Sequence, residues 1–126
     1  MYKKDIHVSG TDELVHAMVT TGFACIRTGK KDNNNLKYFP RIAPHCGSVR
    51  RTGAATLDLC YVACGKFDAF WEMRLNPWDY KAGVLIVQEA GGKVTDFSDG
   101  QDIAGRQELL ASNGTALHDK LLTFLK

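Results

Sequence analysis

The stretch from Arg50 to Phe97, RRTGAATLDLCYVACGKFDAFWEMRLNPWDYKAGVLIVQEAGGKVTDF, alternates between helix signals and strand signals. Gly65 is a natural stop for the first helix, and Pro77 presets the chain for the start of the second. Apolar periodicity and loose alternation separate the two kinds of element. The predicted elements are, in order, a helix over residues 53–64, a strand over 67–73, a helix over 78–90 and a strand over 93–97.

The same alternation continues on both sides of this stretch. The further predicted elements are a short helix over 9–16, a strand over 18–26, a helix over 35–44, an extended piece over 48–50, a strand over 109–112 and a last helix that Thr115 caps and that runs to Leu125. Strands alternating with helices indicate an α/β fold, here a layered α/β/α domain with a mainly parallel or mixed sheet. The 126 residues fit one domain, residues 1–126.

The helix over 53–64 shows an apolar stripe, and one pair of its cysteines needs an explanation. The stripe consists of Ala55, Leu57, Cys60, Tyr61 and Cys64. Cys60 and Cys64 lie four residues apart on one face of this helix, which would suit a metal or redox pair, and the favoured interpretation is two small buried apolar side chains. His45 beside Cys46 could suggest zinc, but no second ligand pair stands at a finger-like spacing.

Composition excludes several classes of function. The net charge is +2, and the basic residues are spread along the chain rather than clustered, which argues against a nucleic-acid surface. No apolar run approaches the ~20 residues that a membrane helix needs. The first residues lack the apolar core of a signal peptide, so a cytoplasmic location is expected.

Two carboxylates and one small-residue helix start are the candidate functional groups. Asp79 falls in the first turn of the helix that follows Pro77, where the helix dipole favours a negative charge, and a simple helix cap is the alternative. Glu72 closes the preceding strand, so both carboxylates are expected at the carboxyl edge of the sheet, where open α/β sheets bind ligands. Glu72 could equally be an exposed polar residue. The small residues Gly53, Ala54 and Ala55 would let backbone N–H groups approach a ligand oxygen, or would form a close-packed turn.

Taken together, the segments R-R-x-G-x-A-x-L-D, F-x-E, W-D-x-x-A-G and E-A-G-G resemble the second half of the inositol monophosphatase family. The resemblance implies a phosphatase that hydrolyses phosphate monoesters with two or three Mg²⁺ ions held by carboxylates. It implies that Asp79 is a metal ligand and that Glu72 contacts a hydroxyl of the polyol. It also implies that the backbone N–H of Ala55 contacts the same part of the substrate, in a loop shaped by Gly53 and Ala54.

The family's first-half motifs, E-E and D-P-x-D-G-T, are absent from this sequence. One carboxylate cannot hold catalytic Mg²⁺ against water, so the chain alone is expected to be inactive and to lack a tight Mg²⁺ site. The expected partners are a missing N-terminal half and a small phosphate ester, with a homo-oligomer left open. Inositol monophosphate or a related sugar phosphate suits Glu72, although sugar bisphosphates and nucleotide phosphates also occur in the family. The alternative is a noncatalytic module that binds a polyol or a partner chain.

Overall fold

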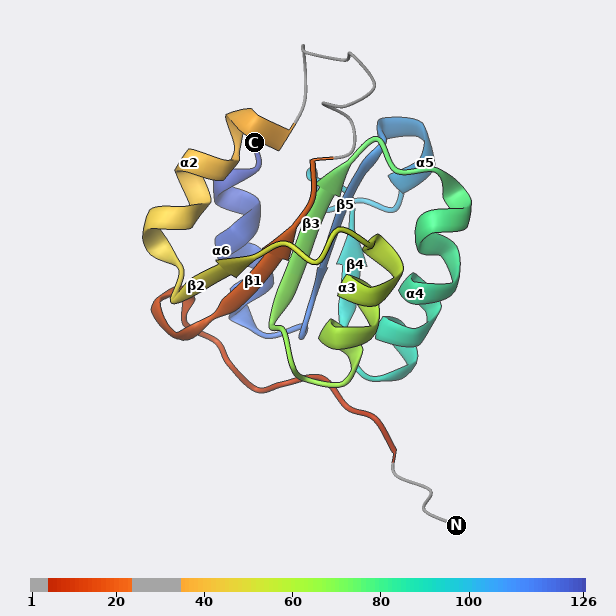
Figure 1. Cartoon of the computed structure of the whole chain (residues 1–126), viewed down its shortest axis with the longest axis horizontal. Helices are drawn as coiled ribbons and strands as arrows, with labels where there is room; N and C mark the ends of the chain where they lie inside the picture. The colour runs from red at the N-terminus through yellow and green to blue at the C-terminus, as the bar shows by residue number, and fades with distance from the viewer. Residues whose placement is uncertain (1–4, 24–34) are drawn as a thin grey trace.

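A five-stranded mixed sheet lies at the centre of the protein, a computed structural model in which residues 5–23 and 35–126 are described (Figure 1). The strands are β1 (Met18–Thr21), β2 (Ser48–Arg50), β3 (Ala69–Met73), β4 (Lys93–Thr95) and β5 (Glu108–Ser112). Their order in the sheet is β2-β1-β3-β5-β4. β1 pairs in parallel with β2 and β3, whereas β5 pairs antiparallel with β3 and β4. Among the described strands, β5 alone therefore runs against the others, and the carboxyl ends of β1, β2 and β3 meet at one edge.

Helices cover both faces of this sheet, as predicted for a layered α/β/α domain. The helices are α2 (Phe39–Ile42), α3 (Ala55–Ala63), α4 (Pro77–Glu89), α5 (Ile103–Arg106) and α6 (Ala116–Phe124), with 3-10 turns at Leu14–His16, Asn35–Lys37 and Ala43–His45. In Figure 1, α3 and α4 lie on one face and α2 and α6 on the other. Two separate apolar clusters fill the two interfaces, one under each pair of helices. Among the described residues, no helix is long and apolar enough to span a membrane.

The alternation along β3 decides which layer each of its side chains joins. Ala69, Trp71 and Met73 belong to the cluster under α2 and α6, whereas Phe70 belongs to the cluster under α3 and α4. Because side chains alternate across a strand, Glu72 points to the same face as Phe70. The carboxylate at the end of β3 is therefore directed towards the layer that contains α3 and α4.

The predicted helix over residues 9–16 is wrong, because only Leu14–His16 is helical. The polar groups expected to cap it bond to distant parts of the chain instead. Ser9 donates its hydroxyl to Asp68, and the Asn113 side chain donates to the carbonyl of Thr11. These long-range bonds hold the segment in an extended form that its composition did not indicate.

Other elements are shorter or divided differently from the prediction. The strand expected over residues 18–26 ends at Thr21, and its part beyond residue 23 lies outside the described residues. The helix expected over 35–44 is divided into two 3-10 turns and α2. One proline stands within the first two positions of α2, and another within the first two positions of the second 3-10 turn. The short helix α5 was not predicted. The helices predicted over 53–64 and 78–90, which are α3 and α4, and the extended piece over 48–50 are confirmed within a few residues.

The predicted apolar stripe of α3 is also wrong. The buried residues are Asp58, Leu59, Val62 and Ala63, whereas Leu57 is exposed. Cys60 is half-buried and Cys64 is exposed, both as free thiols, so they are not a buried apolar pair. The helix is apolar on nearly every side, so its periodicity could not show which face meets the sheet.

Candidate functional site

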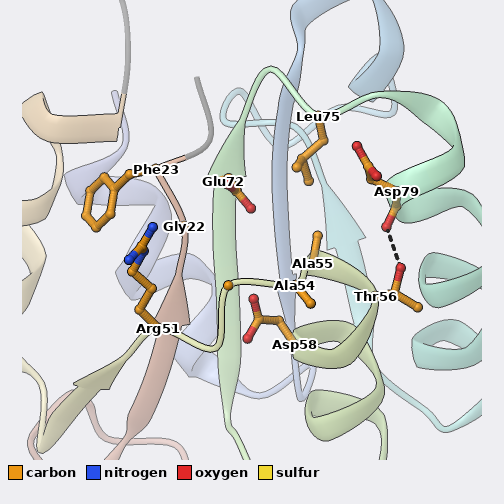
Figure 2. A pocket seen from close by; sticks show the side chains of 11 residues that line it. Gly22, Phe23, Arg51, Ala54, Ala55, Thr56, Asp58, Glu72, Leu75 and Asp79 are labelled. Carbon is orange, nitrogen blue, oxygen red and sulfur yellow. Dashed lines mark hydrogen bonds between the residues drawn. The ribbon is translucent and has the colours of Figure 1, made fainter. Parts of the chain in front are cut away.

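A pocket of about 310 Å³ lies at the carboxyl edge of β1, β2 and β3, where α3 and α4 begin (Figure 2). Its lining residues come from four segments of the chain. They are Gly22, Phe23, Arg51, Gly53, Ala54, Ala55, Thr56, Asp58, Glu72, Leu75 and Asp79. All five residues singled out from the sequence, Gly53, Ala54, Ala55, Glu72 and Asp79, line it. The fold thus brings the predicted residues together in a single hollow.

Glu72 is the most enclosed of the predicted residues. It lies in β3, opposite Leu109 of β5, and only 4% of its surface is exposed. Figure 2 shows its carboxylate between the segment that follows β1 and the start of α3. The alternative of an exposed polar residue closing a strand is therefore wrong for Glu72.

Asp79 caps its helix and lines the pocket at the same time. It occupies the third position of α4, where Asn76 and Asp79 form a reciprocal capping box. Its Oδ2 atom accepts a hydrogen bond from the Asn76 backbone N–H at 3.1 Å. Within the described part of the chain its Oδ1 atom has no hydrogen-bond partner, so one oxygen remains for a ligand. The helix-cap and ligand interpretations are thus compatible.

A hydrogen bond joins the starts of the two helices beside the pocket. The Thr56 hydroxyl donates to the Asp79 carbonyl oxygen at 3.2 Å, drawn as the dashed line in Figure 2. Among the described residues, no side chain caps the start of α3, where Ala54 is the flanking residue. The first N–H groups of a helix have no partner inside the helix, so those of α3 can donate to a ligand oxygen.

The loop before α3 owes its shape to Gly53 and Thr52. Gly53 has a φ of +88°, a conformation that costs a glycine little. The Thr52 hydroxyl lies 3.2 Å from the Ala54 backbone nitrogen, which donates to it. This turn directs the chain past the pocket with small side chains, as the sequence predicted.

Asp58 is a buried carboxylate of the pocket that the sequence did not single out. It is 1% exposed and accepts hydrogen bonds from the Thr20 and Thr52 hydroxyls, both at 2.8 Å. Burial raises the pKa of the Asp58 carboxyl, and the two hydroxyl groups lower it only in part. These bonds tie the loop before α3 to β1. The available signal was an aspartate inside an apolar helix, which usually needs a partner.

Arg51 and Phe23 form the wall opposite Asp79 and were also not singled out. The Arg51 guanidinium lies 5.9 Å from the centre of the Phe23 ring, a cation–π distance. Figure 2 shows the guanidinium beside Gly22 and Phe23, on the far side of Glu72 from Asp79. The pocket therefore has a cationic end and an end with carboxylates.

The carboxylates of the pocket do not form a complete metal site by themselves. Within residues 5–23 and 35–126, no three His, Cys, Asp or Glu side chains lie close enough to hold one ion. Mg²⁺ can be held by one or two carboxylates when substrate phosphate and water supply the other oxygens. Asp79 fits the part of one ligand in a site that is shared with other groups.

Comparison with known proteins places these features in a family. The model of the inositol monophosphatase family matches residues 1–126. The chain is 44% identical over 117 residues to the phosphatase IMPL1 of Arabidopsis thaliana, covering 93% of this chain and 31% of that protein. It is 42% identical over 123 residues to the Nus factor SuhB of Pseudomonas aeruginosa, covering 96% of this chain and 45% of that protein.

A solved structure agrees with both the fold and the sequence match. The inositol monophosphatase of Anabaena (Nostoc) sp. PCC 7120 superposes with a TM-score of 0.87 at 42% identity, covering 95% of this chain and 47% of that one. This chain therefore spans less than half the length of each of these three proteins. The resemblance found in its motifs is confirmed: the chain belongs to the inositol monophosphatase family.

Proposed function

We propose that this chain supplies the polyol-binding side and one metal ligand of a Mg²⁺-dependent phosphomonoesterase. Its substrate would be inositol monophosphate or a related sugar or polyol phosphate, and its products an alcohol and inorganic phosphate. The observation that carries this function is the convergence of Glu72, Asp79 and the start of α3 on one pocket. Membership of a family that contains inositol monophosphatases supports the same reaction.

In this function Asp79 would help to hold one Mg²⁺ ion, since its Oδ2 atom accepts from the Asn76 N–H and its Oδ1 atom is left for a ligand. When bound, Mg²⁺ neutralises charge on the phosphate and its leaving group and lowers the pKa of a bound water. The capping box fixes the Asp79 side chain before any ligand arrives, because both members of the box hold each other. A ligand held in place in this way loses little freedom on binding.

Glu72 and the start of α3 hold the alcohol part of the substrate in this scheme. The Glu72 carboxylate accepts a hydrogen bond from a polyol hydroxyl, and such a charge-assisted bond is stronger than a neutral one. The Ala55 N–H donates to an oxygen of the same group. Gly53 and Ala54 keep the approach clear of bulky side chains, as their position in the pocket wall indicates.

We further propose that the remaining ligands come from a preceding N-terminal half, and that the chain alone is inactive. The sequence lacks the family's first-half metal motifs, and the chain spans less than half of its relatives. Large apolar side chains on the outer surface of α3 and α4 would then be covered by that half: Trp78 is 78% exposed, Leu85 57% and Leu57 41%. Free thiols at Cys46, Cys60 and Cys64 suit the reducing cytoplasm proposed as its location.

The same exposed surface supports a second candidate, a noncatalytic module that binds a polyol or another protein. A homo-oligomer formed through this surface is one version of it. The two candidates differ in what completes the pocket. An enzyme gains Mg²⁺-dependent turnover when the first half is supplied, whereas a binding module does not.

The test is an assay of phosphate release from myo-inositol 1-phosphate with Mg²⁺. One sample is the chain alone. The other, called here the joined protein, carries at its N-terminus the part of the Anabaena enzyme that precedes the region matched by this chain. We expect turnover of about 1 s⁻¹ or faster only from the joined protein. Comparable turnover by the chain alone, or none by a folded joined protein, would refute the proposed division of the site.

A further inference from the structure

The chain that leaves β1 passes directly over the Glu72 carboxylate. Gly22 follows the last residue of β1, is buried and lines the pocket. A Cβ atom built on Gly22 would lie 2.7 Å from Cδ and 2.8 Å from Oε2 of Glu72, and also against Oε1. These distances are shorter than real carbon contacts allow, since optimal separations are about 3.5–4.0 Å. The Glu72 carboxylate therefore occupies space that is open because residue 22 has no side chain.

A buried polar network fixes Gly22 in this position. Asn35 is fully buried, and its Nδ2 atom donates to the Gly22 carbonyl at 2.8 Å and also to the Thr21 hydroxyl. Its Oδ1 atom accepts from the indole N–H of Trp71. The Thr21 hydroxyl in turn donates to the Trp71 carbonyl at 2.8 Å. A buried network whose members are all satisfied favours a single arrangement.

This network fixes the position of Gly22 relative to Glu72, the residue against which Gly22 lies. Trp71 directly precedes Glu72 in β3, and Val19, Thr20 and Thr21 pair with residues 69–71 of the same strand. The backbone pairing of the two strands, the Thr21 hydroxyl and the Asn35 side chain thus hold β1 against β3. They do so at Trp71, the residue just before Glu72. The Glu72 side chain lines the pocket, so a displacement away from Gly22 can carry its carboxylate into the pocket.

We infer that Gly22 is a positioning residue that holds the Glu72 carboxylate at the depth where it meets a polyol hydroxyl. This inference rests on the proposed role of Glu72 in substrate binding. A methyl group at residue 22 displaces the carboxylate into the pocket, where it occupies space that the polyol needs. Asn35, Thr21 and Trp71 support this role because they prevent the backbone of residue 22 from moving aside instead.

The experiment compares Gly22→Ala with Gly10→Ala, since a Cβ atom at Gly10 meets nothing within 4 Å. The readout is the KM for myo-inositol 1-phosphate with Mg²⁺, measured on the joined protein made with the natural chain or with either variant of it. We expect Gly22→Ala to raise the KM about tenfold or more, because small displacements of positioned groups have large effects. Gly10→Ala should leave the KM as it is with the natural chain. An equal KM with Gly22→Ala and with the natural chain would overturn the inference.

A thermal unfolding cycle tests the contact without any ligand. Gly22→Ala should lower the unfolding temperature of the natural chain but not that of Glu72→Ala, in which the crowded carboxylate is gone. An equal loss in both backgrounds shows that residue 22 clashes with something else and overturns the inference. If the joined protein made with the natural chain shows no turnover, the proposed function fails, and the unfolding cycle still decides whether Gly22 positions Glu72. If Gly22→Ala alone does not fold while the double variant does, the contact is supported.

Discussion

Replacing Asp79 by Asn in the joined protein is expected to lower phosphate release from myo-inositol 1-phosphate roughly 100-fold or more. The amide removes the negative charge that attracts Mg²⁺, and losing ~3 kcal/mol of transition-state stabilisation corresponds to about that factor. The Asn side chain retains an oxygen that accepts from the Asn76 N–H, so the helix cap is preserved. The effect should thus come from the metal site rather than from the fold. Rates measured over a Mg²⁺ titration check it.

The control for this variant is Asp119→Asn, which removes a carboxylate from the first turn of α6, where Asp119 is exposed. This control should keep the activity of the joined protein within about twofold, because surface changes away from a site have small effects. If Asp79→Asn retains most of the activity at every Mg²⁺ concentration, Asp79 is a helix cap and nothing more.

Lowering the pH from 7 to 5 is expected to reduce the unfolding free energy of the chain by about 2 kcal/mol through His118. His118 is 1% exposed, and its ring nitrogens lie 2.9 Å from the Thr95 hydroxyl oxygen and 2.7 Å from that of Ser112. Burial first and the charge of Lys93 second lower the pKa of His118 from its ordinary value of 6.5 to about 4, although Asp99 and Asp119 oppose this shift. The unfolded chain therefore takes up a proton below pH 6.5, whereas the folded chain does so only near pH 4. Stability is full above pH 6.5 and is lost as the pH falls towards 4.

Urea unfolding of the natural chain and of His118→Gln at both pH values measures this effect. The Gln variant is expected to be less stable at pH 7, since it disturbs two buried hydrogen bonds, but to lose much less stability at pH 5. His16→Gln, at an exposed position, is the matched control and should behave as the natural chain. An identical pH dependence in the natural chain and in His118→Gln would contradict the assignment to His118.

The central helices and the pocket residues could be predicted because their signals are local. Pro77 and Asp79 mark the start of α4 within a few residues, and Gly53 to Ala55 mark the start of α3. The carboxyl edge of parallel strands then brings these starts together without any knowledge of the remaining contacts. Glu72 was located correctly for the same reason, as the residue near the end of a strand followed by a loop and a helix.

The features that were missed depend on contacts between distant residues. The extended segment after Ser9 is held by Asp68 and Asn113, which no local pattern connects to it. The direction of β5 is set by its pairing with β3 and β4, since its own sequence is equally compatible with either direction. The hydrogen bonds of Asp58 and the close approach of Gly22 to Glu72 depend on how β1, β3 and α3 pack together, which no local pattern predicts.

The central claim is that the start of α4 meets a metal ion whose other ligands lie outside this chain. Replacing Mg²⁺ by paramagnetic Mn²⁺ in the joined protein, and recording which backbone signals of this chain broaden, tests it most directly. Broadening should be strongest at Asp79 and its neighbours, weaker along α3, and absent near Asp119, and it should diminish in Asp79→Asn. Broadening centred on another part of the chain, or unchanged by Asp79→Asn, would contradict the claim.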